Sequence, residues 1–165
     1  MSQAAWKTSV TVAAIVERDG RYLVVEEHTP DGLMLNNPAG HLDPGESPLQ
    51  GVIRETLEES GRRFTPDALV GVYLSRAQRS EPPSDVTFLR LAFTGAVSEP
   101  LPGHQLDPEI VRTLWLTPDE LRACLPRHRS PLLMRCVDDH RAGRRHPLDL
   151  VFSDPSVHLP PLPEP

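Results

Sequence analysis

Hydrophobic and polar residues alternate in several separate stretches of this chain, and a period of two residues is typical of β-strands. The predicted strands cover residues 9–16, 22–26, 33–36, 68–76, 86–96 and 110–116. An Asp-Gly pair at residues 19–20 favours a tight turn, so we expect the first two strands to form a hairpin. Polar segments containing Pro or Gly, at residues 77–85 and 98–108, predict loops.

Between the third and fourth strands the pattern changes to that of a helix with clear signals at both ends. Ser47 is an N-cap candidate, Pro48 fits the first helical position, and Gln50 completes a capping box. Gly61 stands where a left-handed residue would end the helix. At about 100° per residue, the apolar positions fall on one arc of roughly 140° that we expect to face the core. These positions are Leu49, Val52, Ile53, Thr56 and Leu57.

Two further helices are predicted after the last strand. Thr117 and Glu120 form a second capping box, which opens a helix that ends near Cys124. Ser130 opens a third helix that runs towards Ala142. Together with the strands, these helices predict an α/β fold.

Length and composition indicate one domain. A chain of 165 residues with 38% hydrophobic residues can bury one adequate core. Residues 147–152 are predicted to be short and extended, and the proline-rich residues 154–165 to form a flexible tail after a domain at residues 1–153. The chain has no apolar run long enough to span a membrane and no signal-peptide pattern at its start, so we expect a cytoplasmic protein.

The formal net charge of −6 narrows the class of partner. An acidic surface disfavours a nucleic acid polymer or an anionic membrane, so we expect neither. Lys7 is the one lysine among 17 basic residues, and the arginines supply forked donors suited to phosphate groups. We expect a small phosphate substrate and either a monomer or a homodimer.

Three carboxylates crowd the helical arc beside the apolar one. Glu55 lies at i,i+3 and i,i+4 spacing from Glu58 and Glu59, where like charges repel. Arg54 can pair with Glu58, but one cation does not neutralise three anions. One interpretation is a solvated acidic face. The other is a site for a hard divalent cation, which would relieve the repulsion.

Seven residues at fixed spacings carry a resemblance to a known family. They are Gly40, Glu46, Arg54, Glu55, Glu58, Glu59 and Gly61, in the order G-x5-E-x7-R-E-x-x-E-E-x-G. This pattern resembles the Nudix box of hydrolases that act on nucleoside-diphosphate-linked compounds. Thr56 stands at a position that is usually aliphatic, and Arg62 replaces the apolar residue that normally follows the last glycine.

The likeness extends over residues 9–152 to the NudJ-type subfamily of Nudix phosphatases. The segments that carry it include VTVAAIVERDGRYLVVEE, NNPAGHLDPGES and SPLLMRCVDDHRAGRRHPLDLV. It implies an α/β/α sandwich with a mixed β-sheet. It also implies Mg²⁺-dependent release of orthophosphate from nucleoside tri- and diphosphates and from hydroxymethylpyrimidine pyrophosphate, with Mn²⁺ as a substitute. Leu35 stands where the subfamily often has an aromatic residue.

The resemblance leaves two alternatives open. One is a Nudix pyrophosphohydrolase on another substrate, such as a dinucleoside polyphosphate, ADP-ribose or an oxidised nucleotide. The other is a nucleotide-sensing Nudix-fold module without catalysis. Such modules typically lose carboxylates of the box, and this chain keeps them all.

The resemblance also assigns roles within the box. The metal ligands would be the carbonyl of Gly40 and the carboxylates of Glu55, Glu58 and Glu59. Of these, Glu59 or Glu55 is expected to matter most, as ligand or as the group that takes a proton from water. Glu46, Arg54 and Gly61 are expected to be structural, with Arg54 orienting Glu58.

Other acids and donors are candidates outside the box. Some family members take their general base from a later loop, and here Asp107 and Glu109 qualify, with Glu109 preferred. An ordinary solvated pair is the alternative. The candidates for substrate binding are Arg90, Arg76, Asn36 and Asn37. Arg90 on an outer sheet face, and asparagines that only form the loop, are the alternative interpretations.

Overall fold

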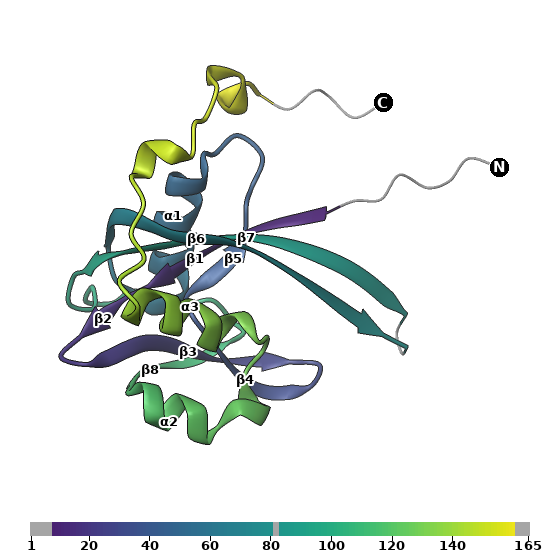
Figure 1. The fold of residues 1–165 in the computed structure, drawn as a ribbon, viewed down its shortest axis with the longest axis vertical. Helices are drawn as coiled ribbons and strands as arrows, with labels where there is room; N and C mark the ends of the chain where they lie inside the picture. Colours follow the sequence, from purple (N-terminus) through teal and green to yellow (C-terminus); the bar gives the residue numbers. More distant parts are fainter. Residues whose placement is uncertain (1–7, 81–82, 161–165) are drawn as a thin grey trace.

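A computed structural model describes residues 8–80 and 83–160 of the chain (Figure 1). Its strands are β1 (Thr8–Ile15), β2 (Glu17–Arg18), β3 (Arg21–Thr29), β4 (Gly32–Asn36), β5 (Ala39–His41), β6 (Phe64–Arg79), β7 (Ser84–Val97) and β8 (Ile110–Leu116). Its α-helices are α1 (Pro48–Ser60), α2 (Pro118–Ala123) and α3 (Leu132–Arg141). Within the described residues, every helix is too short or too polar to cross a lipid bilayer.

The strands form two sheets. In the first, the order is β5-β1-β7-β6, and this sheet is mixed because β1 runs parallel to β7 while the other neighbours are antiparallel. In the second, β3 pairs in antiparallel fashion with β2, β4 and β8. The predicted α/β architecture with a mixed sheet is therefore present.

Helices cover the first sheet on both faces. Successive residues of a strand point to opposite faces, so β1 and β7 contribute to two separate cores. Ala13 and Ala92 face the core that includes α3, whereas Val12 and Leu91 face the core that includes Val52 of α1. The result is a layered arrangement in which α1 and α3 lie on opposite sides of the sheet.

The ends of α1 follow the sequence signals. Ser47 Oγ accepts a hydrogen bond from the Gln50 N–H, and Gln50 Oε1 accepts one from the Ser47 N–H at 2.8 Å. Gly61 ends the helix with φ of 66° and donates its N–H to the Leu57 carbonyl. These contacts satisfy backbone groups that a bare helix end leaves without partners.

The predicted core-facing arc of α1 was partly wrong. Val52 and Thr56 are buried as expected, but Ile53 is 39% exposed. The buried side is rotated towards Glu55 and Glu59, each 8% exposed. Part of the buried face of the helix is therefore made of carboxylates, which the periodicity of apolar residues cannot predict.

The predicted hairpin between residues 9–16 and 22–26 was also wrong. The turn itself forms, with positive φ at Asp19 and Gly20, but it joins β3 to the two-residue strand β2. The preceding strand, β1, lies in the other sheet between β5 and β7. The chain thus changes sheets at Val16, and the turn signal specified only the residues next to it.

Three segments differ from prediction in extent. The segment 77–85, expected to be a loop, is mostly strand, because β6 extends as far as Arg79 and β7 already begins at Ser84. Residues 81–82 lie outside the described residues. Residues Leu148–Leu150 form a 3-10 helix instead of an extended segment. Of the predicted tail at 154–165, Pro155–His158 form a 3-10 helix, and residues 161–165 lie outside the described part. Its flexibility stays a prediction.

Candidate metal and substrate site

The acidic side of α1 lies against the strand that precedes it. Glu59 Oε2 accepts a hydrogen bond from the backbone N–H of Ala39 at 2.8 Å. Glu55 lies beside Gly40, where a Cβ atom would stand 2.1 Å from the Glu55 carboxyl carbon. The predicted ligands Gly40, Glu55 and Glu59 are therefore neighbours, although at least 14 residues lie between Gly40 and the glutamates in the sequence.

Arg54 links the carboxylates of the box. Its guanidinium donates to Glu46 at 2.6 and 3.0 Å, to Glu55 at 2.8 Å and to Glu58 at 3.0 Å, and also to the His41 carbonyl at 3.0 Å. The Glu46 partner raises the pKa of Arg54, and Arg54 in turn lowers the pKa of Glu46. Glu46 also accepts from the Asp43 N–H, so it ties the loop to the helix. The contact of Arg54 with Glu58 is the predicted one.

Two carboxylates of this site resist ionisation. Burial raises the pKa of Glu59 to about 9, and the charges of Glu27, Glu55 and Asp107 add to the shift while the Ala39 N–H opposes it. Burial also raises the pKa of Glu55, against the effect of Arg54. Buried anions without enough positive charge nearby explain both shifts. A divalent cation is the kind of charge that would oppose both shifts and favour the ionised form of each carboxylate.

The residues present fit such a cation in their chemistry. Carboxylate and backbone carbonyl oxygens are the donors that hard divalent ions prefer, and Gly40 leaves the space in which Glu55 lies. Within residues 8–80 and 83–160, no three His, Cys, Asp or Glu side chains already stand in a metal-binding arrangement. In this structure the Arg54 guanidinium donates to Glu55 and Glu58, and the Ala39 N–H donates to Glu59.

The loop before β8 brings a further acid to this site. Asp107 donates its backbone N–H to the Glu58 carbonyl at 3.0 Å, and its charge raises the pKa of both Glu55 and Glu59. Glu109, the preferred base on sequence grounds, is exposed, and its carbonyl accepts from the His28 N–H at 2.8 Å. Of the two candidates, Asp107 is therefore the one whose charge acts on the glutamates.

Three of the four predicted substrate-binding residues meet in one cluster. Arg90 is 7% exposed and makes long hydrogen bonds to Asn36 Oδ1 at 3.4 Å and Asn37 Oδ1 at 3.5 Å. Arg90 Nε and Asn37 Nδ2 are buried and have no partner among the described residues. Burial lowers the pKa of Arg90. Unsatisfied buried donors are costly, so this cluster is poised to accept a polar group.

Glu27 belongs to the same neighbourhood and was not predicted. It pairs with Arg129 at 2.5 Å, its other carboxylate oxygen is buried without a partner among the described residues, and burial raises its pKa. Its charge also acts on Glu59. The available sequence signal was a buried strand that ends in two acids, and strand periodicity alone gives no reason to single out either.

The remaining candidate, Arg76, lies on the β6–β7 hairpin. It forms an exposed ion pair with Asp85 at 2.5 Å, and the neighbouring Arg79 pairs with Asp31. Among the described residues, neither arginine forms a hydrogen bond or ion pair with the acidic side of α1 or with Arg90. Leu35, the position of the missing aromatic residue, is 1% exposed in the core.

With this geometry established, comparison with known proteins identifies the family. The sequence model of the NUDIX domain matches residues 6–136. The chain belongs to the NUDIX family. Phosphatase NudJ of Escherichia coli strain K12 is 30% identical to this Nudix chain over 146 residues, which are 88% of this chain and 92% of that protein. Phosphatase NudJ of Shigella flexneri matches to the same extent.

Solved structures agree with the Nudix assignment. A NUDIX hydrolase from Nitrosomonas europaea superimposes with a TM-score of 0.81 at 45% identity, covering 90% of this chain and 98% of that one. A MutT NUDIX hydrolase from Burkholderia pseudomallei, at 20% identity, shares the fold with a TM-score of 0.65, covering 81% and 98%. The protein is thus a Nudix hydrolase that acts on pyrophosphate bonds of small phosphate compounds, and this family generally uses divalent metals.

Proposed function

We propose that this Nudix hydrolase releases orthophosphate from nucleoside tri- and diphosphates and from hydroxymethylpyrimidine pyrophosphate, with Mg²⁺ as cofactor and Mn²⁺ as a substitute. The observation that carries the proposal is the contact of Glu55 with Gly40 and of Glu59 with Ala39, which gathers buried carboxylates on one side of α1. The likeness to phosphatase NudJ over 88% of the chain supports the substrate class.

In this proposal the box residues divide into ligands and supports. The Gly40 carbonyl and the carboxylates of Glu55, Glu58 and Glu59 would hold the metal, which would supply positive charge for the substrate phosphates and lower the pKa of a bound water. Glu46 and Arg54 hold the loop and the ligands in place, as their hydrogen bonds indicate.

Proton transfer falls to an acid beside this set. A general base must lie within reach of the attacking water, directly or through one further water. Asp107 is favoured over Glu109 because its backbone N–H bonds to the Glu58 carbonyl and its charge raises the pKa of Glu55 and Glu59, whereas Glu109 is exposed. Glu59 itself is the alternative, because it lies on the same buried side of α1 as Glu55.

The rest of the substrate is assigned to the cluster formed by Arg90 of β7 with Asn36 and Asn37. Arg90 has a buried Nε without a partner, and Asn37 a buried amide in the same state, among the described residues. A phosphate oxygen or a heterocyclic acceptor would satisfy these donors. Arg76 stays a weaker candidate, because Asp85 already occupies its guanidinium.

The test is a product analysis. Purified protein with Mg²⁺ is incubated with nucleoside tri- and diphosphates, hydroxymethylpyrimidine pyrophosphate, a dinucleoside polyphosphate and ADP-ribose, and phosphorus NMR identifies each product. Orthophosphate from the first three supports the proposal, and cleavage of only the last two contradicts it. The matched control is Glu59→Gln, which keeps an acceptor for the Ala39 N–H and is expected to lower turnover by about 100-fold or more while the fold persists.

A further inference from the structure

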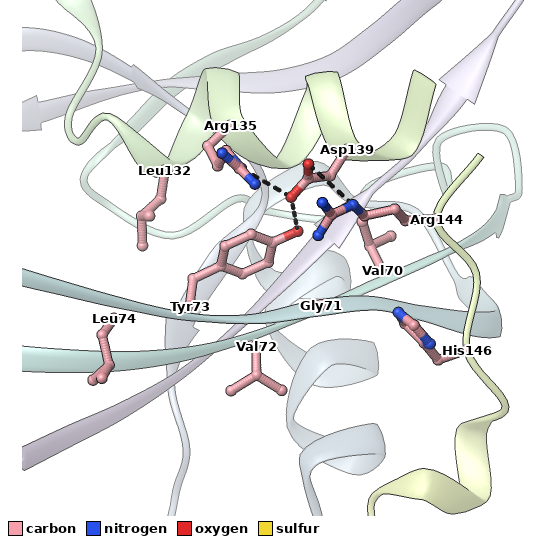
Figure 2. A pocket seen from close by; sticks show the side chains of 10 residues that line it. All are labelled: Val70, Gly71, Val72, Tyr73, Leu74, Leu132, Arg135, Asp139, Arg144 and His146. Atoms are coloured by element: carbon pink, nitrogen blue, oxygen red, sulfur yellow. Dashed lines mark hydrogen bonds and ion pairs between the residues drawn. The ribbon is translucent and has the colours of Figure 1, made fainter. Parts of the chain in front are cut away.

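A second site is suggested by a pocket of about 450 Å³ between edge strand β6 and helix α3 (Figure 2). This volume lies within the range of pockets that take small ligands. The side chains that line it on the α3 side are Tyr73, Leu132, Arg135, Asp139, Arg144 and His146. Because α3 and α1 pack on opposite faces of the first sheet, the pocket is not part of the acidic site.

Asp139 organises the pocket. Its side chain is 7% exposed, and it accepts from the Tyr73 hydroxyl at 3.0 Å and from Arg135 Nε at 3.0 Å, while Arg144 Nε lies 3.4 Å away. Figure 2 shows the two guanidinium groups converging on this carboxylate from opposite sides. One buried anion thus fixes the direction of two arginines that are otherwise half exposed.

This arrangement leaves donors for a ligand. Both contacts to Asp139 use Nε, and no Nη group of Arg135 or Arg144 makes a hydrogen bond to another residue of the described chain. Two guanidinium groups and one carboxylate leave one net positive charge, with His146 close by. Paired Nη groups match two phosphate oxygens better than a point charge does.

Position along the chain argues against a purely local role for these arginines. Basic groups in the last turn of a helix complement its dipole, and His140 and Arg141 of α3 do so. Arg135 lies in the first half of α3, and Arg144 lies beyond its end. The dipole accounts for neither, yet both meet at Asp139, in a protein whose net charge is −6.

The pocket also offers an apolar wall. The ring of Tyr73 folds over Gly71, where a Cβ atom would stand 2.7 Å from the Tyr73 hydroxyl, so the glycine makes room for the ring. Leu132 lies beside the ring on the same side of the pocket (Figure 2). An apolar wall next to two fixed cations suits a ligand with a phosphate at one end and a flat or apolar body at the other.

We propose that this pocket binds a phosphomonoester, with its phosphate held by the Nη groups of Arg135 and Arg144 and its organic part against Tyr73 and Leu132. Tyr73 stands opposite Arg90 in the β6–β7 ladder. The site therefore lies one strand away from the cluster assigned to the substrate.

The experiment measures binding to the metal-free protein, so that phosphate cannot bind through a cation at the glutamates. After EDTA treatment, the full chain is titrated by calorimetry with inorganic phosphate, with uridine monophosphate and with uridine. We expect uridine monophosphate to bind more tightly than inorganic phosphate, and uridine not to bind. Equal affinity for phosphate and uridine monophosphate would contradict the role of the apolar wall, and binding of uridine would contradict the role of the arginines.

Matched variants locate the site. Arg135→Gln and Arg144→Gln are each expected to weaken binding by about ten-fold or more, because each removes a charged fork. Arg122→Gln is the control, since Arg122 of α2 pairs with Asp138 of α3 and neither lines the pocket, and it is expected to change affinity by less than about two-fold. Circular dichroism confirms that each variant is folded.

Glu59→Gln separates this site from the catalytic one. It is expected to bind uridine monophosphate like the wild type, whatever the phosphatase assay shows. No binding to the wild type, equal binding by Arg144→Gln, or loss of binding in Glu59→Gln would overturn the proposal.

Discussion

Gly40 leaves the space that the carboxylate of Glu55 occupies, since a Cβ atom at Gly40 would stand 2.1 Å from the carboxyl carbon and from Oε1. We predict that Gly40→Ala lowers turnover by about 100-fold, because the added methyl group displaces Glu55, a proposed metal ligand, by an ångström or more. The displaced atoms are the far end of a flexible side chain, so the free energy of unfolding is expected to change little. Steady-state kinetics and urea denaturation measure the two effects.

A double-mutant cycle tests whether Glu55 transmits this effect. If Gly40→Ala acts by moving Glu55, then Gly40→Ala combined with Glu55→Gln should be no slower than Glu55→Gln alone. If the rate loss of the double variant instead equals the product of the two single losses, Gly40 acts independently of this carboxylate.

The two loop acids give a second prediction. The charge of Asp107 reaches both Glu55 and Glu59, whereas Glu109 is exposed. Asp107→Asn is therefore expected to lower kcat by about 100-fold, the usual size of a general-base effect, and Glu109→Gln by less than about three-fold. The measurement is kcat over a range of pH at saturating Mg²⁺. A larger loss in Glu109→Gln would return the assignment to the residue that the sequence favours.

Adjacent aspartates on α3 give a matched pair for stability. Asp139 is buried and serves Tyr73, Arg135 and Arg144, so Asp139→Ala is expected to lower the free energy of unfolding by about 3 kcal/mol. Asp138 is half exposed and pairs with Arg122, so Asp138→Ala should cost less than about 1 kcal/mol. Urea denaturation of both variants gives the comparison, and equal losses would mean that Asp139 has no organising role.

Local signals in the sequence predicted where helices and strands lie better than they predicted which strands pair with one another. The capping residues of α1, at Ser47, Gln50 and Gly61, form as expected because a cap depends on residues a few positions apart. The predicted pairing of β1 was wrong because its parallel neighbour β7 starts far along the chain, at Ser84, and no local sequence pattern specifies that partner. A turn such as Asp19-Gly20 sets the register of its own flanks and nothing beyond.

The candidate site shows the same division. The spacing of Glu55 and Glu59 places them on one side of a helix, and in the structure Glu55 lies against Gly40 and Glu59 against Ala39. Burial of these carboxylates was missed, because a helix with glutamates at those positions ordinarily turns them to solvent. Glu27 was missed because its nearness to Glu59 depends on how β3 of the second sheet meets α1, which is a matter of tertiary packing.

Acid stability supplies the last prediction, through a histidine outside the site. His140 Nδ1 lies 2.7 Å from the Tyr22 hydroxyl, and Nε2 lies 2.6 Å from Arg145 Nη2. Burial, reinforced by the charge of Arg145, lowers the pKa of His140 from 6.5 to about 4. Between these two pKa values, His140 is protonated in the unfolded chain and neutral in the folded protein. The contribution of His140 to stability is therefore complete above about pH 6.5 and is lost as the pH falls towards 4.

His140→Gln removes the titrating group, so the difference in urea midpoint between wild type and variant should shift in favour of the variant as the pH falls from 7 to 4.5. Tyr22→Phe is the control for cause: it removes the hydroxyl next to Nδ1 and keeps the burial. Because burial is the larger cause of the shift, Tyr22→Phe should retain most of the wild-type acid sensitivity. If the difference in urea midpoint between wild type and His140→Gln stays constant from pH 7 to 4.5, His140 is not held neutral by its surroundings.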